Sequence, residues 1–381
     1  MNGRQRMMAV LRHEEIDQIP FTMYAETLKI FGLALYEPWR KLLDQGLSLF
    51  VAEAAQPYKV QCPNASMDIT HHYKTSTSWA PVDILVSLNT PHIIAGNIQT
   101  PVGDDKFHAS VKGLDMSVQL PWFPEDGFII KSLNDYEVIK FLVEDSEYTP
   151  FYDDITEFQA LIGDYGVVPA FMPKSPLQSM IMLMGLKQIA IGYHAHRKEF
   201  DDLYHVIYKK EIELFKIAAE SPAEVIWGPD NVTSLITSPI LFEKYNLPFY
   251  NEVSDILHKQ DKVYVVHMDG ALHDLVDLIA RTKIDAIESF TPPPTGNLSI
   301  HNARKAWKDK VIWANFPESE CLHGGTAVRK ITRQMLADAA PGDNFLMGIS
   351  EGFPSFLHML ENVPKILKTV VKHGKYPIST S

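Results

Sequence analysis

The stretch VYVVHMDG-ALHDLVDLIARTK-IDAIESF, residues 263–290, decides the fold class. Its first and last parts are short apolar runs rich in Val and Ile, and each has the length of a buried strand. The middle part places Leu and Ile at intervals of three and four residues, as an amphipathic helix does. A strand, a helix and a second strand in this order predict a βαβ unit.

The same alternation extends over most of the chain. Apolar runs of strand length occur at residues 19–24, 47–52, 167–172, 224–228, 263–267, 284–290, 311–316 and 345–350. Segments with helical periodicity occur at residues 3–12, 132–143, 176–193, 198–220, 239–259, 270–282, 299–308, 326–339 and 360–373. Eight strands, most of them followed by a helix, predict an α/β fold, the (β/α)8 TIM barrel.

Residues 58–128 interrupt this alternation. They contain short runs in which apolar and polar residues alternate, and they are rich in Thr, Ser and Pro. Such alternation in short runs is typical of antiparallel strands. We therefore expect a single barrel domain over residues 1–381 with an inserted antiparallel β excursion at about 58–128.

Composition and charge exclude several classes of protein. The formal net charge of −12 disfavours nucleic acid and anionic membrane surfaces as partners, because both attract basic patches. No run of about 18 apolar residues exists to span a bilayer, and the first residues contain no apolar segment of the secretory kind. Two cysteines are too few for a disulfide framework. These features predict a cytoplasmic protein.

Polar side chains stand where the predicted strands end. His267 and Asp269 follow one strand, and Glu288 lies in the next. In a parallel barrel the carboxyl ends of the strands surround the active site, so these groups could bind a metal or move a proton together. The alternatives are a core histidine held by hydrogen bonds, a helix cap at Asp269 and an ion pair at Glu288.

Three further positions have a similar place in the predicted barrel. Asp230 and Asn231 follow the strand at 224–228, and either they bind substrate and move protons or they make a turn. Glu351 follows the last strand, and Gly352 beside it allows backbone and ligand to approach closely. We expect Glu351 to bind a ligand.

Several segments resemble the uroporphyrinogen decarboxylase superfamily. They are GRQRMMAVLRHEEIDQIPF (3–21), SPILFEKYNLPFYNEVSDIL (238–257) before VYVVHMDG, and VIWANF (311–316) before EGFPSFLHMLENV (351–363). One branch of this superfamily decarboxylates uroporphyrinogen and carries an arginine-rich phrase after its first strand, which suits a substrate with eight carboxylates. The corresponding FTMYAETLKIF (21–31) contains no arginine, so this activity is not expected.

The resemblance to the other branch implies a zinc-dependent methyltransferase that uses a corrinoid. That branch has a His-x-Cys pair and a later Cys as metal ligands. Here His267 is kept, while Asp269 and Glu351 stand where the two thiols would be. Histidine with carboxylates is also a normal ligand set for catalytic zinc. The resemblance therefore implies His267 and Glu351 as metal ligands, with Asp269 beside them, and Asn315 as a residue that binds cofactor or substrate. The place of Glu288 at the end of the neighbouring strand adds it to the expected metal ligands.

The function expected from these observations is transfer of a methyl group from a small O-methyl compound. No Asp-x-His-x-x-Gly phrase for corrinoid binding is present, so the corrinoid should sit on a separate partner protein. Trp79, Trp122, Phe123 and Trp227 could line an aromatic pocket, which would suit a methoxy-aromatic donor. Two alternatives stay open: a metal-free lyase in which Asp230 or Asp269 stabilises a protonated intermediate, and a barrel that binds a small molecule without catalysis.

Overall fold

The chain forms two compact units in its computed structural model, which describes residues 1–24, 37–52, 55–72, 92–111, 129–350 and 355–379. One unit comprises Met1–Tyr58, Pro150–Pro173 and Phe215–Ser381, and the other comprises Lys59–Thr149 and Lys174–Leu214. The first unit contains the barrel and all the residues of the candidate site that the structure describes.

The barrel is built from one parallel sheet, with the strand order β8-β2-β1-β14-β13-β12-β11-β10-β9. Its strands are β1 (Phe21–Tyr24), β2 (Leu47–Phe50), β8 (Gly166–Val167), β9 (Ala170–Phe171), β10 (Val225–Gly228), β11 (Val263–His267), β12 (Ala286–Phe290), β13 (Val311–Asn315) and β14 (Phe345–Ile349). Every pairing between neighbours is parallel, as the βαβ pattern predicts.

The two ends of this sheet are consecutive in the chain, and this closes the ring. β8 pairs with β2 and β9 pairs with β10, while only Val168 and Pro169 separate β8 from β9. Proline has no backbone N–H to give to a ladder, so it interrupts the strand at this point. Counted as one interrupted strand, residues 166–171 complete the eight strands, and the predicted TIM barrel is confirmed.

The inside of the barrel is filled by large side chains from alternate strand positions. Phe50, Trp227 and Trp313 belong to one buried cluster with the lumen-facing residues of the other strands. Helix α1 (Gly3–Leu11) adds four apolar residues to the same cluster, namely Met7, Met8, Val10 and Leu11. The lumen is therefore a packed core toward its amino end and not a pore.

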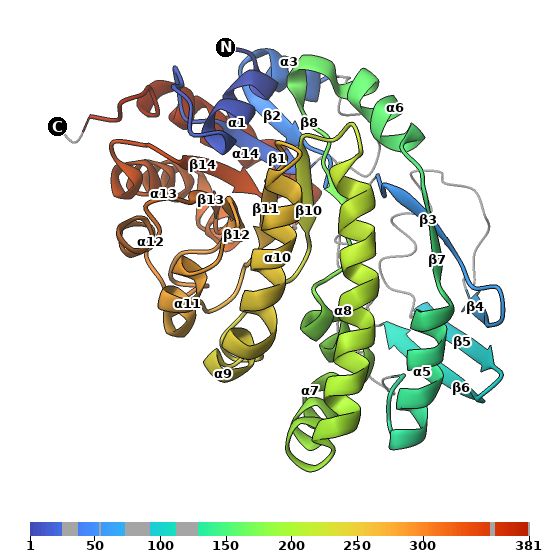
Figure 1. Cartoon of the computed structure of the whole chain (residues 1–381). Coiled ribbons are helices and arrows are strands. Elements are labelled where there is room, and N and C mark those ends of the chain that lie inside the picture. Colours follow the sequence, from blue (N-terminus) through green and yellow to red (C-terminus); the bar gives the residue numbers. More distant parts are fainter. Residues whose placement is uncertain (25–36, 53–54, 73–91, 112–128, 351–354, 380–381) are drawn as a thin grey trace. The chain divides into compact units, whose positions relative to one another are not determined.

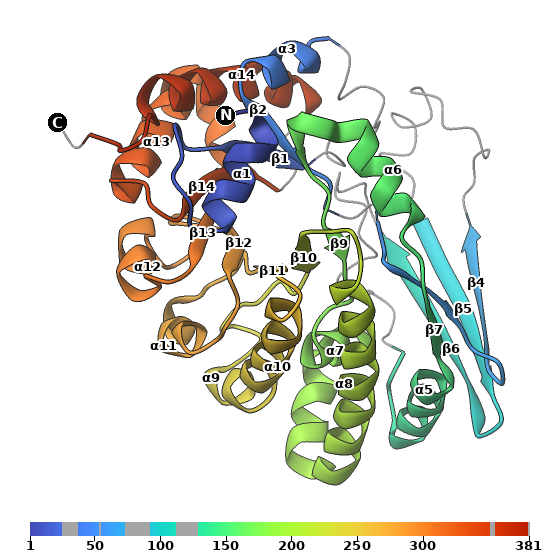
Figure 2. The ribbon, with the colours of Figure 1, turned by 45° about the horizontal axis from the view of Figure 1, so that its top comes forward.

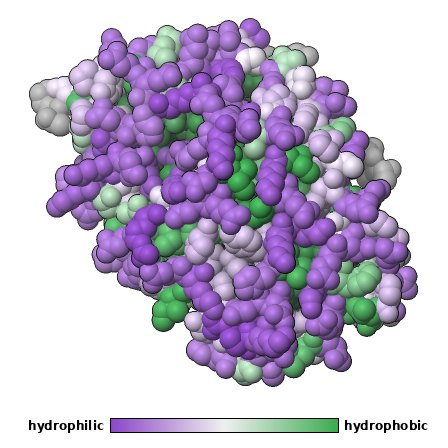
Figure 3. Space-filling view, viewed as in Figure 1, coloured by the Kyte–Doolittle hydropathy of each residue, from purple (hydrophilic) through white to green (hydrophobic). Residues whose placement is uncertain are grey.

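Helices surround the strands on the outside of the barrel, as Figure 2 shows for α10 to α14. The helices of this unit, with shorter turns, are α3 (Trp39–Asp44), α6 (Asp153–Ile162), α9 (Pro239–Leu241), α10 (Leu247–His258), α11 (Val276–Ala280), α12 (Ile300–Ala306), α13 (Gly324–Ala339) and α14 (Phe356–His373). The face in Figure 3 is mainly hydrophilic, with small separate hydrophobic areas. Among the described residues, no helix is both long and apolar enough to cross a membrane.

The helix predicted at 270–282 is much shorter than expected. Residues 270–272 form a loop, and regular α-helix covers only α11. The loop bonds to the segment after β10 instead: Ala271 N–H donates to Thr233 Oγ1 at 3.1 Å, and Ser234 N–H donates to Ala271 O at 2.8 Å. Contacts between two loops at the barrel mouth thus override the local helical pattern.

Two other helices differ in detail from their predicted ranges. Helix α14 begins at Phe356, four residues early, because Ser355 caps it by accepting a hydrogen bond from His358 N–H. Pro248 has no backbone N–H for a helical hydrogen bond, yet it does not break the segment 239–258. A π-helical turn at Phe242–Asn246 precedes α10 and accommodates the absent hydrogen bond. Helices α3 and α6 were not predicted.

The second unit contains the antiparallel part. Strands β4 (Ser66–His72), β5 (His92–Thr100) and β6 (Gly103–Val111) form an antiparallel sheet in that order, so the predicted excursion is confirmed. The same unit contains α5 (Leu133–Asp145), α7 (Pro176–Ala195) and most of α8 (Arg197–Ala219). Strand β3 (Tyr58–Gln61) pairs with β7 (Glu147–Pro150) near the boundary of the two units.

We expect the interaction of His258 with Asp285, on the outside of the barrel, to make the stability depend on pH. His258, at the end of α10, bonds with Nε2 to the carboxylate of Asp285 at 3.0 Å, and this hydrogen bond raises its pKa. The folded-state pKa lies above the unfolded value of about 6.5. The interaction therefore contributes its full stabilisation below the unfolded pKa, and this stabilisation is lost as the pH rises through the folded-state pKa. The free energy of unfolding of His258→Gln should therefore fall further below wild type at about pH 6 than at about pH 8.

Chemical unfolding at both pH values measures this difference. His301, exposed on α12, provides the control, since His301→Gln should give no pH-dependent change. An equal loss for His258→Gln at both pH values would contradict the role of the charged histidine.

Candidate active site

The inward rows of the barrel end in polar side chains at its carboxyl end. Successive side chains of a strand point to opposite faces. His267 follows two residues after Val265 of the lumen cluster, and Glu288 follows Ala286 in the same way, so both face the lumen. Asn315 continues the row of β13. His267 and Glu288 are also direct partners in the register of β11 and β12, as expected for neighbouring strand ends.

One oxygen of Glu288 is the centre of this site. Its Oε2 accepts from Tyr24 OH at 2.8 Å and from Trp227 Nε1–H at 3.2 Å, and it lies 2.7 Å from His267 Nδ1. All four side chains are buried, Glu288 with only 1% exposed. Four strands of the ring, β1, β10, β11 and β12, thus converge on a single carboxylate.

A bulge in β12 accompanies this arrangement. The register with β13 shifts between Ile287 and Phe290, and Ser289 has a left-handed φ of 58°. A non-glycine residue in this region costs free energy, and such residues gather at functional sites. Ser289 Oγ lies 2.5 Å from Ser350 Oγ, so β12 is linked to the end of β14 across β13. The bulge is therefore tied in place by a neighbouring strand.

The charge of His267 follows from its neighbours. Burial by itself lowers the pKa of the imidazole, but the negative charges of Glu288 and Asp269 and their hydrogen bonds raise it well above the usual value. Both ring nitrogens face carboxylates, and these favour the protonated imidazole in the protein without a bound metal. A metal ion would displace the proton from one nitrogen.

His267 Nε2 and Asp269 form the pair best placed to hold a metal. Nε2 lies 3.7 Å from Asp269 Oδ2. Two ligands of one tetrahedral zinc ion stand about 3.4 Å apart, given metal–ligand distances of about 2.0–2.2 Å. The pair thus fits a zinc ion with little adjustment. Within the described ranges, no three His, Cys, Asp or Glu side chains group around a possible metal position, and Glu351 lies outside those ranges.

Asn315 is held in one orientation at the end of β13. Its Oδ1 accepts from the backbone N–H of Ser350 at 3.0 Å, which assigns the other end of the amide as the NH2 group. That Nδ2 donates to no residue in the described part of the chain. The side chain is 2% exposed, so two oriented N–H donors remain for a bound molecule near the lumen.

Asp230 and Asn231 lie beyond the end of β10. Asn231 has a φ of 53°, which asparagine tolerates better than most residues, so the chain turns here. Asp230 is buried and accepts a hydrogen bond from Tyr250 OH, which in turn accepts from Asn246 Nδ2 at 3.2 Å. No contact between these residues and His267 is observed among the described side chains. Their roles in substrate binding and proton transfer stay predictions.

Sequence reasoning missed Tyr24. It is the last residue of β1 and shares its inward face with Thr22, which accepts a hydrogen bond from the lumen residue Trp313. The rule that selected His267, a polar side chain at the end of an apolar strand, could have selected it too. Of the aromatic residues expected to line a pocket, Trp227 reaches the site, whereas Trp79, Trp122 and Phe123 lie outside the described residues.

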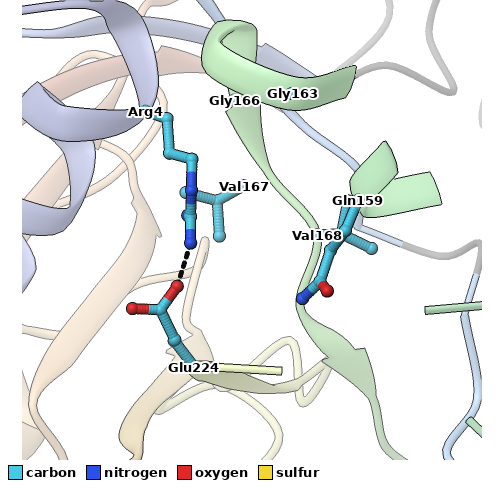
Figure 4. Close-up of a pocket in the computed structure, with 7 residues that line it drawn as sticks. All are labelled: Arg4, Gln159, Gly163, Gly166, Val167, Val168 and Glu224. Carbon is cyan, nitrogen blue, oxygen red and sulfur yellow. Dashed lines mark hydrogen bonds and ion pairs between the residues drawn. The ribbon is translucent and has the colours of Figure 1, made fainter. Parts of the chain in front are cut away.

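A small cavity lies at the opposite end of the strands. Its volume is about 100 Å³. Figure 4 shows Arg4 paired with Glu224 on one side of the cavity, while Gln159 lies on the other side. Glu224 precedes β10, and its carboxylate pairs with both Arg4 and Arg12. The polar groups here satisfy one another, so this cavity has the character of a structural ion-pair site at the amino end of the barrel.

Comparisons with known proteins agree with this architecture. A solved structure described as a methyltransferase from Methanosarcina mazei is similar with a TM-score of 0.55, at 12% identity, over 98% of this chain and 98% of that chain. This likeness concerns the fold. No curated protein matches the chain significantly. The family model described as Uroporphyrinogen decarboxylase (URO-D) matches residues 121–373, about two-thirds of the chain, and the chain therefore belongs to the uroporphyrinogen decarboxylase family.

Proposed function

We propose that the protein is a methyltransferase that takes a methyl group from a small O-methyl compound, such as a methoxy-aromatic compound. The acceptor in this proposal is a corrinoid carried by a separate protein. Its main support is the pair of His267 Nε2 and Asp269 Oδ2, 3.7 Å apart at the carboxyl end of the barrel. Family membership and the fold shared with a methyltransferase are consistent with it.

His267 and Asp269 would hold a zinc ion, and Glu351 is the predicted further ligand. Zinc bound there would act as a Lewis acid that stabilises negative charge developing on the oxygen that loses its methyl group. Without such stabilisation an alkoxide or phenoxide is a poor leaving group. Oxygen ligands in place of thiolates leave more positive charge on the metal, which favours this role.

The chain's own residues would bind and orient the methyl donor. Asn315 Nδ2, fixed by the bond from Ser350 N–H to Oδ1, can donate to an oxygen of the donor. Tyr24, Phe50 and Trp227 pack edge to face or tilted, with ring centroids 5.8–6.1 Å apart, beside the polar groups. Aromatic side chains next to a few oriented polar groups suit an aromatic ether better than methanol.

Zinc content and methyl transfer test the proposal together. The purified protein should contain about one zinc ion per chain. With a reduced Co(I) corrinoid and methoxybenzenes as donors, it should form methyl-Co(III), which is followed by its visible absorption. A protein that binds no zinc even when zinc is supplied, and methylates no corrinoid, would contradict the proposal. Decarboxylation of a carboxylate substrate by this metal-free protein would identify the lyase alternative.

A further inference from the structure

We infer that Glu288 is not a metal ligand but a positioning residue, which with Tyr24 and Trp227 fixes His267 so that Nε2 is the nitrogen offered to the reaction. The inference deepens the proposed function and rests on it only for what Nε2 binds. It also assigns positioning roles to Tyr24 and Trp227, and no sequence pattern indicated these roles.

The distances around His267 distinguish its two nitrogens. Nδ1 lies 2.7 Å from Glu288 Oε2, which is a hydrogen-bond length and well below the separation of about 3.4 Å between two ligands of one tetrahedral zinc. Nε2 lies 3.7 Å from Asp269, close to that separation. Nδ1–H therefore donates to Glu288, and Nε2 remains for a metal.

The hydrogen bonds to Glu288 favour the same assignment. A carboxylate oxygen offers about two lone pairs, and Oε2 already receives donors from Tyr24, Trp227 and His267. Binding a metal through Oε2 would remove two or three of these bonds in a buried place, where a lost hydrogen bond is costly. A histidine whose second nitrogen donates to a carboxylate is the common arrangement behind a metal ligand.

Tyr24 and Trp227 hold the carboxylate from two directions. Tyr24 OH donates to Oε2 and also lies 3.3 Å from His267 Nδ1, so it contacts both members of the pair. The indole of Trp227 packs edge to face with the imidazole, with ring centroids 6.0 Å apart. These two side chains limit how far Glu288 and His267 can rotate, and this rigidity is what a metal ligand requires.

Metal affinity and the spectrum of bound Co(II) test the inference in the full-length protein. Glu288→Gln should weaken zinc binding by about 10–100-fold, the usual effect of losing such a carboxylate, while the visible spectrum of the Co(II)-loaded protein keeps its position and intensity. Tyr24→Phe should weaken zinc binding in the same direction and to a smaller extent. Chelator competition measures the affinities without any assay of activity.

Tyr152→Phe is the matched control, because it removes a hydroxyl that donates to Ile217 O at 2.9 Å away from the site. It should leave zinc affinity unchanged. A Co(II) spectrum that changes in Glu288→Gln, together with an unchanged affinity in Tyr24→Phe, would show that Glu288 is a ligand and would overturn the inference.

Proton NMR separates this inference from the proposed function. If the wild-type protein binds neither zinc nor cobalt, the proposed function fails, but the metal-free protein should still show a downfield Nδ1–H signal from His267. That signal should be absent in His267→Ala and should shift in both Glu288→Gln and Tyr24→Phe. A signal that neither of these two substitutions moves would refute the positioning role independently of any metal.

Discussion

Replacing His267 with alanine is expected to abolish zinc binding and to reduce methyl transfer by at least about 10³-fold. The imidazole is the one nitrogen donor of the pair at the carboxyl end of the barrel, and without it only Asp269 and the predicted ligand Glu351 remain, which are too few to hold the ion tightly. A Lewis acid supplies several kcal/mol of stabilisation to a developing oxyanion, and about 4 kcal/mol corresponds to a factor of about 10³ in rate. Elemental analysis and the methyl-Co(III) assay measure the two effects.

The matched control for this experiment is His301→Ala. His301 is exposed on α12, so its removal should change neither zinc content nor rate. Circular dichroism verifies that both variants fold. Full activity of His267→Ala, with zinc retained, would exclude His267 from the metal site and with it the proposed mechanism.

The second large effect concerns the closure of the barrel. A Cβ on Gly166 would lie 2.0 Å from the carbonyl oxygen of Leu49 and 2.7 Å from its carbonyl carbon. Because both belong to the backbone of paired strands, neither can move aside cheaply. We expect Gly166→Ala to lower the free energy of unfolding by about 3 kcal/mol or more, the upper range for overpacking. Urea unfolding measures this change.

Gly163→Ala provides the comparison, three residues earlier in the same turn. Its Cβ would meet no atom within 4 Å, but its φ of 53° is unfavourable for alanine. The cost should therefore be about 1 kcal/mol, from backbone conformation alone. Equal effects of the two substitutions would show that the contact between β8 and β2 is looser than the structure indicates.

The barrel was predictable because each of its strands is a compact apolar run. Parallel strands buried on both faces need no more than this, so VYVVH and VIWAN were placed within a residue of their observed bounds. The interruption at Pro169 and the loop at residues 270–272 were not predictable. The first depends on where the two ends of the sheet meet, and the second on hydrogen bonds to Thr233, which local periodicity does not contain.

The site was predictable only in part, for a similar reason. His267 and Glu288 end neighbouring strands, and the βαβ pattern alone places them side by side. Tyr24 is 264 residues from Glu288 in the sequence and reaches it across the lumen. Which side chains meet there depends on the order of strands around the ring and on the bulge at Ser289, and neither is encoded in a short motif.

Helix α1 has a consequence for where reactants enter the barrel and where products leave it. Its Met7, Met8 and Leu11 belong to one buried cluster with Val225 and Val263, the first residues of β10 and β11, so the amino end of the lumen is filled. In the proposed reaction, donor, acceptor and product would then enter and leave at the carboxyl end of the strands. An acceptor protein bound over this end would block release of the demethylated product. The product would then leave only after the acceptor has dissociated, which gives the reaction a fixed order of release.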